Sequence, residues 1–443
     1  MAGYSYLTLE QLRSELLQRL QDPSAQFTTV PEANIYIHEA LRVLNAQTYA
    51  WNANYQFDFA VGDKWKSLNV AGSPRERTIT DADLLTQMEA MLLEPMSGSV
   101  WTGTNQFNIG LLSAALQYRR DELLLECAAN MVNWTYPSPT GSMRTPLPDS
   151  TLDVMRVRWI QADTTSGSPY VLGREDIGTV NAFSPRSGVE PGWPDSWVIT
   201  SNPPLSFDVS CPVSEPGAWD TLLSFAGVAF NPPTAALVGL PDDWAWVCLY
   251  GALADVLATA PEGRDSTRSK YCLSRYEQGK KAMRELPWLI QATVGSVSVD
   301  TPSHIEMDSW DQNWEQNHEP SDPLVVVGGM DLVALAPNPT TDTVSSVLTL
   351  VGNAPVPTSD SSQIQLSRDG VDAVLAYAQH LSTFKRGGDD FLQTIPLLEQ
   401  FEAYCRAKNS EYAALGIYRP DLLVQGVRND VLDPRFIEAG SNG

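Results

Sequence analysis

The sequence has few of the residues on which catalytic and metal sites most often depend. Its 443 residues include only four histidines and five cysteines. The cysteines are far apart and form no C-x-x-C pair and no zinc-ligand spacing, so we expect free, mostly buried thiols in a reducing compartment. A P-loop, a G-x-G-x-x-G turn and a G-x-S-x-G motif are also missing. We therefore expect no enzyme activity and no cofactor.

Positive charge is also scarce. The chain has 29 Lys and Arg against 53 Asp and Glu, a formal net charge of −24, and residues 285–367 contain no Lys or Arg. Such a balance disfavours nonspecific adhesion to nucleic acid or to anionic membrane. The basic residues form no stripe of the kind that binds nucleic acid. An acidic wall would nevertheless let DNA pass without binding it.

Long apolar runs are absent. No segment approaches the roughly 20 apolar residues that cross a bilayer, and the chain does not open on a secretion signal. We expect a soluble protein that is synthesised in the cytoplasm and has no membrane partner. The hydrophobic fraction of 43% is sufficient for packed cores, and the length favours two to four domains.

Helix-start signals are concentrated in the first third of the chain. Thr8 with Gln11, and Thr29 with Glu32, have capping-box spacing and precede helical apolar periodicity. A third helix follows Thr80, and a fourth is expected from about Asn108 to Trp134. Its predicted buried face contains Leu111 and the leucines up to Leu124, whereas Arg119 and Arg120 are expected to be exposed.

One pattern occurs twice in the remainder of the chain. Residues 196–284 and 324–409 each pass through β-rich segments, a proline turn and a further β-rich segment, and then a pair of helices. A repeated supersecondary unit is typical of building parts rather than of a single catalytic pocket. The predicted fold is therefore α+β, with an N-terminal helical bundle followed by two β-rich-plus-helix-pair units.

These signals predict five segments. They are a helical domain with a small β-hairpin (1–148), a β-rich segment with a helix pair (149–290), an acidic linker (291–323), a second β-rich segment with a helix pair (324–409) and a C-terminal arm (410–443).

Few side chains suggest a chemical site. His38 and His380 lie in helical patterns and are expected to pack rather than to bind metal. The acidic stretch contains Glu306, Asp308, Asp311 and Glu315 with Trp310 and Trp314, which could form a hydrolase acid pair on an aromatic platform. We expect instead a solvated linker or a channel-facing surface, because the stretch has no regular period.

Several segments of the chain share a pattern with a known family. They are LTLEQLRSELLQRLQDP (7–23), PEANIYIHEALRVLNA (31–46), LLEP (92–95), WTGTNQF (101–107), ALQYRRDELL (115–124), GLPDDWAW (239–246), YGALADVL (250–257), EGRDSTRSKY (262–271) and VLAYAQHLSTFKRGG (374–388). In these patches the chain resembles the head–tail connector (adaptor or neck) proteins of tailed bacteriophages. Its greater length and its β-rich repeats depart from the small helical adaptors of that family.

The resemblance implies a structural virion protein that forms a ring, a homododecamer, at the head–tail junction. Its partners would be further copies of itself, the portal protein above and tail, nozzle or fibre proteins below, with DNA passing through the channel. Aromatic candidates for subunit or portal contacts are Tyr49, Trp51, Tyr55, Tyr412 and Tyr418. The alternatives are a fibre-attachment or glycan-binding virion module and a tail-associated hydrolase.

Overall fold

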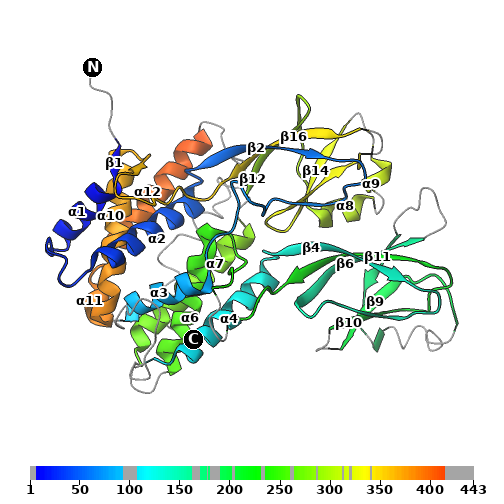
Figure 1. Ribbon diagram of the computed structural model, residues 1–443, viewed down its shortest axis with the longest axis horizontal. Coiled ribbons are helices and arrows are strands. Elements are labelled where there is room, and N and C mark those ends of the chain that lie inside the picture. The colour runs from blue at the N-terminus through cyan, green and yellow to red at the C-terminus, as the bar shows by residue number, and fades with distance from the viewer. Residues whose placement is uncertain are drawn as a thin grey trace.

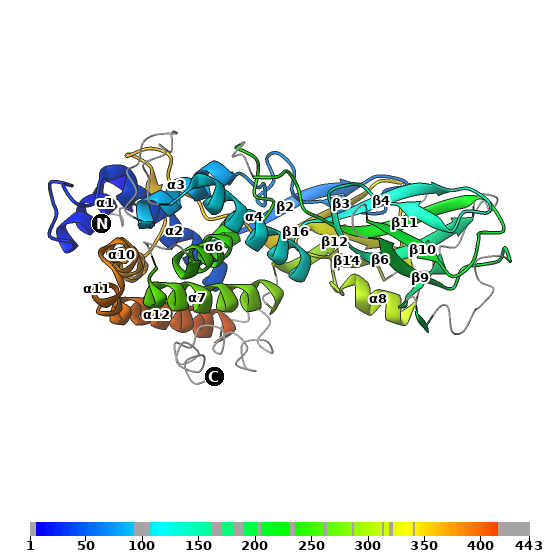
Figure 2. The same ribbon diagram turned by 90° about the horizontal axis from the view of Figure 1, so that it is seen from below.

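The computed structural model describes residues 6–92, 107–161, 170–176, 178–179, 190–201, 205–230, 235–259, 264–285, 288–311, 314–318, 322–339 and 342–414. It is a mixed α+β structure, as the sequence predicts. Except for two short helices at residues 304–310 and 314–317, the helices are gathered at one end of an elongated molecule, and two β modules project side by side from the other end (Figures 1 and 2).

Two units with the same order of principal elements make up most of the described part of the chain. Unit A comprises residues 6–68 and 288–414. Its elements are β1 (Leu7–Thr8), α1 (Leu9–Arg19), α2 (Val30–Thr48), β2 (Asn52–Phe59), β3 (Lys66–Ser67), β12 (Leu289–Val294), β13 (Val297–Val299), α8 (His304–Trp310), α9 (Trp314–Asn317), β14 (Leu324–Gly328), β15 (Leu332–Ala336), β16 (Val344–Val351), β17 (Gln363–Ile364), α10 (Arg368–Thr383), η2 (Phe384–Arg386), α11 (Gly388–Leu392) and α12 (Ile395–Ala414).

Unit B comprises residues 80–285 and is inserted between β3 and β12 of unit A. Its elements are α3 (Asp81–Leu92), α4 (Ile109–Glu126), β4 (Met131–Ser138), β5 (Arg144–Pro146), β6 (Thr151–Gln161), β7 (Tyr170–Val171), β8 (Gly173–Arg174), β9 (Ser196–Ser201), β10 (Ser206–Val209), β11 (Gly217–Phe225), η1 (Asp242–Trp244), α6 (Ala245–Thr259) and α7 (Ser266–Glu285).

The sheets of the two units have the same topology. One sheet has the order β4-β11-β6-β7 in unit B and β2-β16-β12-β13 in unit A. The other has the order β5-β10-β9-β8 in unit B and β3-β15-β14 in unit A. The parallel pairing of β8 with β9 corresponds to a parallel bridge between Ser303 and Val327. Each β module therefore contains strands from both ends of its own unit.

The helix and the strand that enter each β module correspond at a constant offset of 79 residues. The N-caps of α2 and α4 are Thr29 and Asn108, 79 positions apart (108 − 29). A left-handed residue follows each helix: Tyr49 with φ 54° caps α2, and Ala128 with φ 47° lies two residues after the end of α4, again 79 positions later (128 − 49). The eight-residue strands β2 and β4 then begin 79 apart (131 − 52). The N-cap, the left-handed residue and the eight-residue strand thus recur at one constant offset without a gap, although α4 is one residue shorter than α2. This agreement indicates an internal duplication.

The segments before the helices correspond in the same way. Thr8, the N-cap of α1, pairs antiparallel with Gln363, which precedes α10. Thr80 pairs antiparallel with Leu237, which precedes α6. The spacings are 72 for the first partners (80 − 8) and 126 for the second partners (363 − 237). In both units this pairing brings the first helix close to the start of the last helix pair.

The nested arrangement revises several sequence-based expectations. The predicted repeat corresponds to the second half of each unit, β9-β10-β11 with α6–α7 and β14-β15-β16 with α10–α12. The expected N-terminal bundle instead supplies the first half of each unit, because β2 pairs with β16 and β4 pairs with β11. The helix predicted over 108–134 ends at Glu126, since Ala128 adopts a left-handed conformation and the chain then enters β4.

Helices of both units share one hydrophobic core. It includes Leu12 and Leu41 of unit A together with Leu116, Leu253 and Tyr276 of unit B, all fully or almost fully buried. In unit B, α6 and α7 approach closely at Gly251 and Gly279, where a Cβ would meet Tyr276 and Val247 respectively. The β module of unit B has a separate core between its two sheets. The helices therefore form one body that holds both modules.

Candidate functional site at the junction of the two units

A buried charge cluster lies where the chain passes from unit A to unit B. Arg75 and Arg77, on the connecting segment 69–79, both bind the carboxylate of Asp331 in the turn between β14 and β15; the Arg75 Nε to Asp331 Oδ1 distance is 3.0 Å. Arg75 also donates to the Val351 carbonyl oxygen at 2.9 Å, and Arg77 donates to that of Ala129 at 2.5 Å. These bonds link residues 69–79 to both units.

Two adjacent carboxylates continue this junction. Asp242 accepts hydrogen bonds from the backbone N–H groups of Thr78 and Ile79 at 2.8 and 3.2 Å. Asp243 accepts from Asn45 Nδ2 at 2.5 Å and from the Ala354 backbone N–H at 3.1 Å. Burial raises the pKa of Asp243 to about 7. The carboxyl of Asp243 is thus held by donors from two separate segments of unit A.

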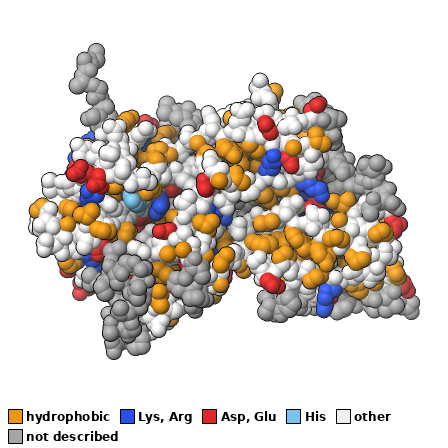
Figure 3. All heavy atoms as spheres, viewed as in Figure 1, with side chains coloured by type: hydrophobic (Ala, Val, Ile, Leu, Met, Phe, Trp, Pro, Cys, Tyr) orange, Lys and Arg blue, Asp and Glu red, His pale blue; other side chains and the backbone are white. Residues whose placement is uncertain are grey.

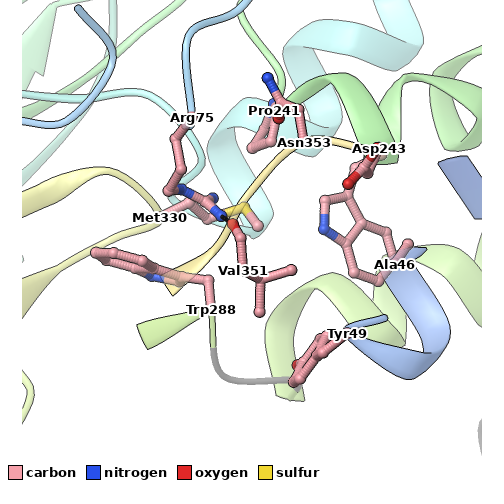
Figure 4. Close-up of a pocket in the computed structure, with 10 residues that line it drawn as sticks. Ala46, Tyr49, Arg75, Pro241, Asp243, Trp288, Met330, Val351 and Asn353 are labelled. Atoms are coloured by element: carbon pink, nitrogen blue, oxygen red, sulfur yellow. Dashed lines mark hydrogen bonds between the residues drawn. The ribbon is translucent and has the colours of Figure 1, made fainter. Parts of the chain in front are cut away.

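A small pocket lies beside these groups (Figure 4). Its lining comes from α2, the connecting segment, η1 and the strands around β14 to β16, and comprises Ala46, Tyr49, Arg75, Pro241, Asp243, Trp244, Trp288, Met330, Val351 and Asn353. The Arg75 guanidinium lies 4.8 Å from the Trp288 ring centroid, at cation–π distance. The polar groups of this pocket bind segments of the chain to one another, which fits a structural joint between the units.

A second charge cluster joins the two β modules. Arg156 and Arg158 lie on β6 of unit B, and Glu315 lies on α9 of unit A; all three are buried. Arg158 binds Glu315 at 2.7 Å and also binds Asp220 on β11. Arg156 lies 3.1 Å from Asp308 and 3.5 Å from Glu315. With Lys64, which is 3.3 Å from Asp220, the cluster has three positive and three negative side chains.

This cluster corrects the expectation of a solvated acidic linker. The stretch forms α8 and α9, and it packs on the sheet of unit B through Asp308 and Glu315. Glu306 is exposed and completes a capping box with Ser303, and Asp311 is the half-buried C-cap of α8. Among these four acids, therefore, the buried Glu315 and the half-buried Asp308 form ion pairs between the two β modules.

The proposed aromatic platform is not formed. Trp314 is fully buried, packs edge-on against Trp65 at a centroid distance of 6.0 Å and donates to Asp308 at 2.9 Å. Trp310 is 69% exposed. Because the two indoles lie in different environments, they present no shared surface for a sugar ring.

The aromatic contact candidates occupy different environments. Tyr49 is buried and packs with Val351 and the partly buried Tyr412 in one small cluster. Two of the predicted contact residues, Tyr49 and Tyr412, therefore contact each other's surroundings within one chain, and Tyr49 is not exposed. Trp51 is half-buried against the helical core. Tyr418 lies outside the described residues.

Tyr55 belongs to an aromatic pair that occurs in both units. It stacks on Phe57 of β2 with ring centroids 5.9 Å apart. At the corresponding positions of β4, 79 residues later, Trp134 stacks on Tyr136 at 5.0 Å. Figure 3 shows hydrophobic side chains gathered over both β modules on the face seen in Figure 1. The pair is thus a conserved feature of the duplication within this chain.

The histidines and cysteines have structural surroundings. His380 is buried between the Tyr271 hydroxyl, 3.0 Å from Nε2, and the Thr394 hydroxyl, 2.8 Å from Nδ1. Burial lowers its pKa to about 3, and burial lowers that of His38 to about 4. All five cysteines are free, and four are buried. The predicted packing role of His380 and the predicted free thiols are confirmed.

One surface feature of α4 differs from the sequence-based prediction. Leu111, predicted to be buried, is exposed, and Tyr118 and Leu125 continue an apolar stripe on the same face of α4. Arg120, predicted to be exposed, is buried. The seven-residue spacing of 111, 118 and 125 places these side chains on one face of the helix and could have indicated the stripe.

Within the described ranges no group of three or more His, Cys, Asp or Glu side chains could hold a metal ion, and no helix there is long and apolar enough to cross a membrane. The sequence matches none of the protein-family models and none of the curated proteins with which it was compared.

Proposed function

We propose that the protein is a structural component of a tailed-bacteriophage head–tail connector, where copies of it form a ring between portal and tail. The observation that carries this proposal is the nested duplication. One chain contains two copies of the same helix–β module–helix-pair unit, joined by ion pairs of the buried Arg156 and Arg158 and by one helical core. A molecule built by repeating one unit is suited to a wall made of many such units.

The positions of the family-like segments support the proposal. In unit A they lie on α1, α2 and α10, and in unit B they lie on α4, on η1 with α6, and on α7. The segments 92–95 and 101–107 lie, except for Leu92 and Phe107, outside the described residues. Apart from α1 and α7, the named helices are corresponding helices of the two units. The resemblance to adaptor proteins therefore concerns the helical body, and each chain supplies two adaptor-like helical groups. In a homododecamer, twelve chains would carry twice as many units.

The arrangement of the molecule suggests how it would act. The helical body would dock on the portal protein, and the β modules at the opposite end would face tail, nozzle or fibre proteins (Figure 1). The net charge of −24 would disfavour adhesion of DNA to the channel wall during its passage. In this role the chain is a mechanical joint of the virion without catalytic activity, cofactor or membrane.

The proposal is tested by co-expressing the chain with the portal protein of the same phage and imaging the purified complex by electron microscopy. We expect a closed ring with a central channel, coaxial with the portal ring. A chain that remains a monomer in the presence of portal, and does not copurify with it, would contradict the proposal.

A further inference from the structure

The contact between the two units uses one face of α2. Tyr36 reaches toward α3 of unit B, with its hydroxyl 3.5 Å from the Ala90 carbonyl oxygen. Burial raises the pKa of Glu39 to about 7, against the opposing effects of Tyr250 and Arg275 of unit B. Ala46 lines the junction pocket beside Asp243 and Trp244. The residues at 36, 39 and 46 lie along one side of the helix, and unit B covers that side.

The corresponding face of α4 has no such cover. With the offset of 79 residues, Glu32, Tyr36, Glu39 and Ala46 correspond to Leu111, Ala115, Tyr118 and Leu125. Glu39 and Ala46 are 3% and 1% exposed, whereas Tyr118 and Leu125 are 64% and 41% exposed. Leu111 is 43% exposed. The same helix face is thus buried in unit A and open in unit B.

The open face is also apolar where its counterpart carries carboxylates. Two glutamates of α2 are replaced by Leu111 and Tyr118 on α4. The Tyr118 ring lies 5.4 Å from the guanidinium carbon of Arg119, which Asp255 fixes through two hydrogen bonds of 2.8 and 2.6 Å. A row of leucine, tyrosine and leucine beside a fixed arginine has the composition of a contact surface.

The contact between units is therefore one-sided. Unit B covers α2 at Tyr36, Glu39 and Ala46, whereas Lys385 of unit A itself binds Glu32. Unit A does not cover the equivalent positions of α4, where Tyr118 and Leu125 are exposed. A contact of this kind is heterologous: it leaves one surface free at each end and can be repeated until a ring closes. The α4 stripe lies on unit B, and within one chain it has no contact equivalent to the one that α2 makes with the other unit.

We infer that the stripe formed by Leu111, Tyr118 and Leu125 is a subunit interface, covered in the assembled protein by unit A of a neighbouring copy of this chain. The α2 face shows that this surface is covered by the other kind of unit. Unit A of the same chain does not reach the α4 face, so a unit A that covers it must come from a second copy. This inference rests on the proposed ring and specifies which surface closes it.

The first test compares Tyr118→Glu and Leu125→Glu with Ile305→Glu, a control at an exposed position of α8 in unit A. The assembly of each purified chain is measured by analytical ultracentrifugation, and its folding by circular dichroism and thermal unfolding. We expect the two α4 variants to fold normally and to lose ring formation, with at least a tenfold fall in the assembled fraction. The control should assemble like the unchanged chain.

The second test places a photo-crosslinking amino acid at position 118 of the full chain and maps the crosslinked peptides by mass spectrometry. Crosslinks to residues 6–68 or 288–414 of another copy support the inference. Crosslinks within one chain, or only to portal or tail proteins, overturn it.

The two proposals can fail separately. If the unchanged chain forms rings and the α4 variants form them equally well, the interface is wrong and the proposed ring stands. If the unchanged chain forms no ring with or without portal, the proposed function fails, and with it the interface.

Discussion

Replacing Glu315 with alanine should weaken the contact between the β modules. Arg158 is fully buried and bound to both Glu315 and Asp220, and Arg156 lies beside Glu315. The cluster has three positive side chains (Lys64, Arg156, Arg158) and three negative ones. Removal of one carboxylate leaves a net positive charge in a buried site.

The size of the effect follows from this imbalance. Breaking a buried ion pair by removing one partner typically costs about 3–5 kcal/mol. Since Asp220 remains beside Arg158, we expect Glu315→Ala to lower the free energy of unfolding by about 2–4 kcal/mol. The matched control is Glu306→Ala, an exposed glutamate on the neighbouring helix α8. It removes only a capping contact, and should cost about 1 kcal/mol or less.

The assay is urea unfolding followed by tryptophan fluorescence, because Trp65 contacts Arg156 and Trp314 donates a hydrogen bond to Asp308 within the cluster. We expect a lower midpoint for Glu315→Ala than for Glu306→Ala. A double variant that also replaces Arg158 with methionine should recover part of the loss, since no unpaired charge then stays buried. Equal midpoints for the two single variants would refute the view that the charge cluster holds the modules together.

Three further predictions concern stability. Burial raises the pKa of Asp243 from 3.8 to about 7. Between these two pH values the folded state therefore holds a proton that the unfolded chain has released. The free energy of unfolding should fall as pH rises from 3.8 to about 7, by on the order of 4 kcal/mol. Melting temperatures of Asp243→Asn from pH 4 to 8 should fall less steeply than those of the unchanged chain, and parallel curves would argue against this assignment. A Cβ at Gly279 would lie 2.5 Å from Val247 Cγ2, so Gly279→Ala should destabilise by about 1–3 kcal/mol; an unchanged melting temperature would mean that α6 and α7 are less tightly packed. Thr8→Ala and Thr80→Ala remove corresponding N-caps. Each should lower the free energy of unfolding by about 1 kcal/mol, and the two losses should add in the double variant. A Thr80→Ala variant as stable as the unchanged chain would weaken the correspondence between α1 and α3.

Local signals predicted the helix starts and part of the repeat. The capping boxes at Thr8 and Thr29 form as expected, because each requires residues only three positions apart. The strand-then-helix-pair order of 196–284 and 324–409 was also visible. The nested arrangement was not, since β2 pairs with a strand 299 residues later at Asn52 and Val351 (351 − 52). Pairing over such distances leaves no periodic trace in the sequence.

The duplication is also hidden at the level of residue identity. Residues 29–59 and 108–138 align without a gap, yet only three positions are identical, namely Leu44 with Leu123, Ala50 with Ala129 and Asn54 with Asn133. Backbone caps, strand lengths and the stacked aromatic pairs agree instead. Different side chains can satisfy the same cap and the same pleat, so the fold persists while the sequence diverges.

The charged site could not be predicted because its partners are far apart in the chain. Glu315 and Asp308 lie in a stretch with no Lys or Arg, and such a stretch is typical of a solvent-exposed linker. Their partner Arg156 is 152 residues before Asp308 and belongs to the other unit. The α4 stripe was misassigned for a related reason. Leu111 fits the apolar periodicity of a core face, and only the comparison with α2 shows that its face is open.

The most direct test of the account is a cryo-electron microscopy reconstruction of the assembled ring, at a resolution that resolves helices. The account predicts a closed wall in which units A and B alternate, with α4 of each copy against unit A of the next copy and the helical body toward the portal. A ring in which the α4 stripe faces solvent, or a preparation that contains only monomers with portal present, would contradict it.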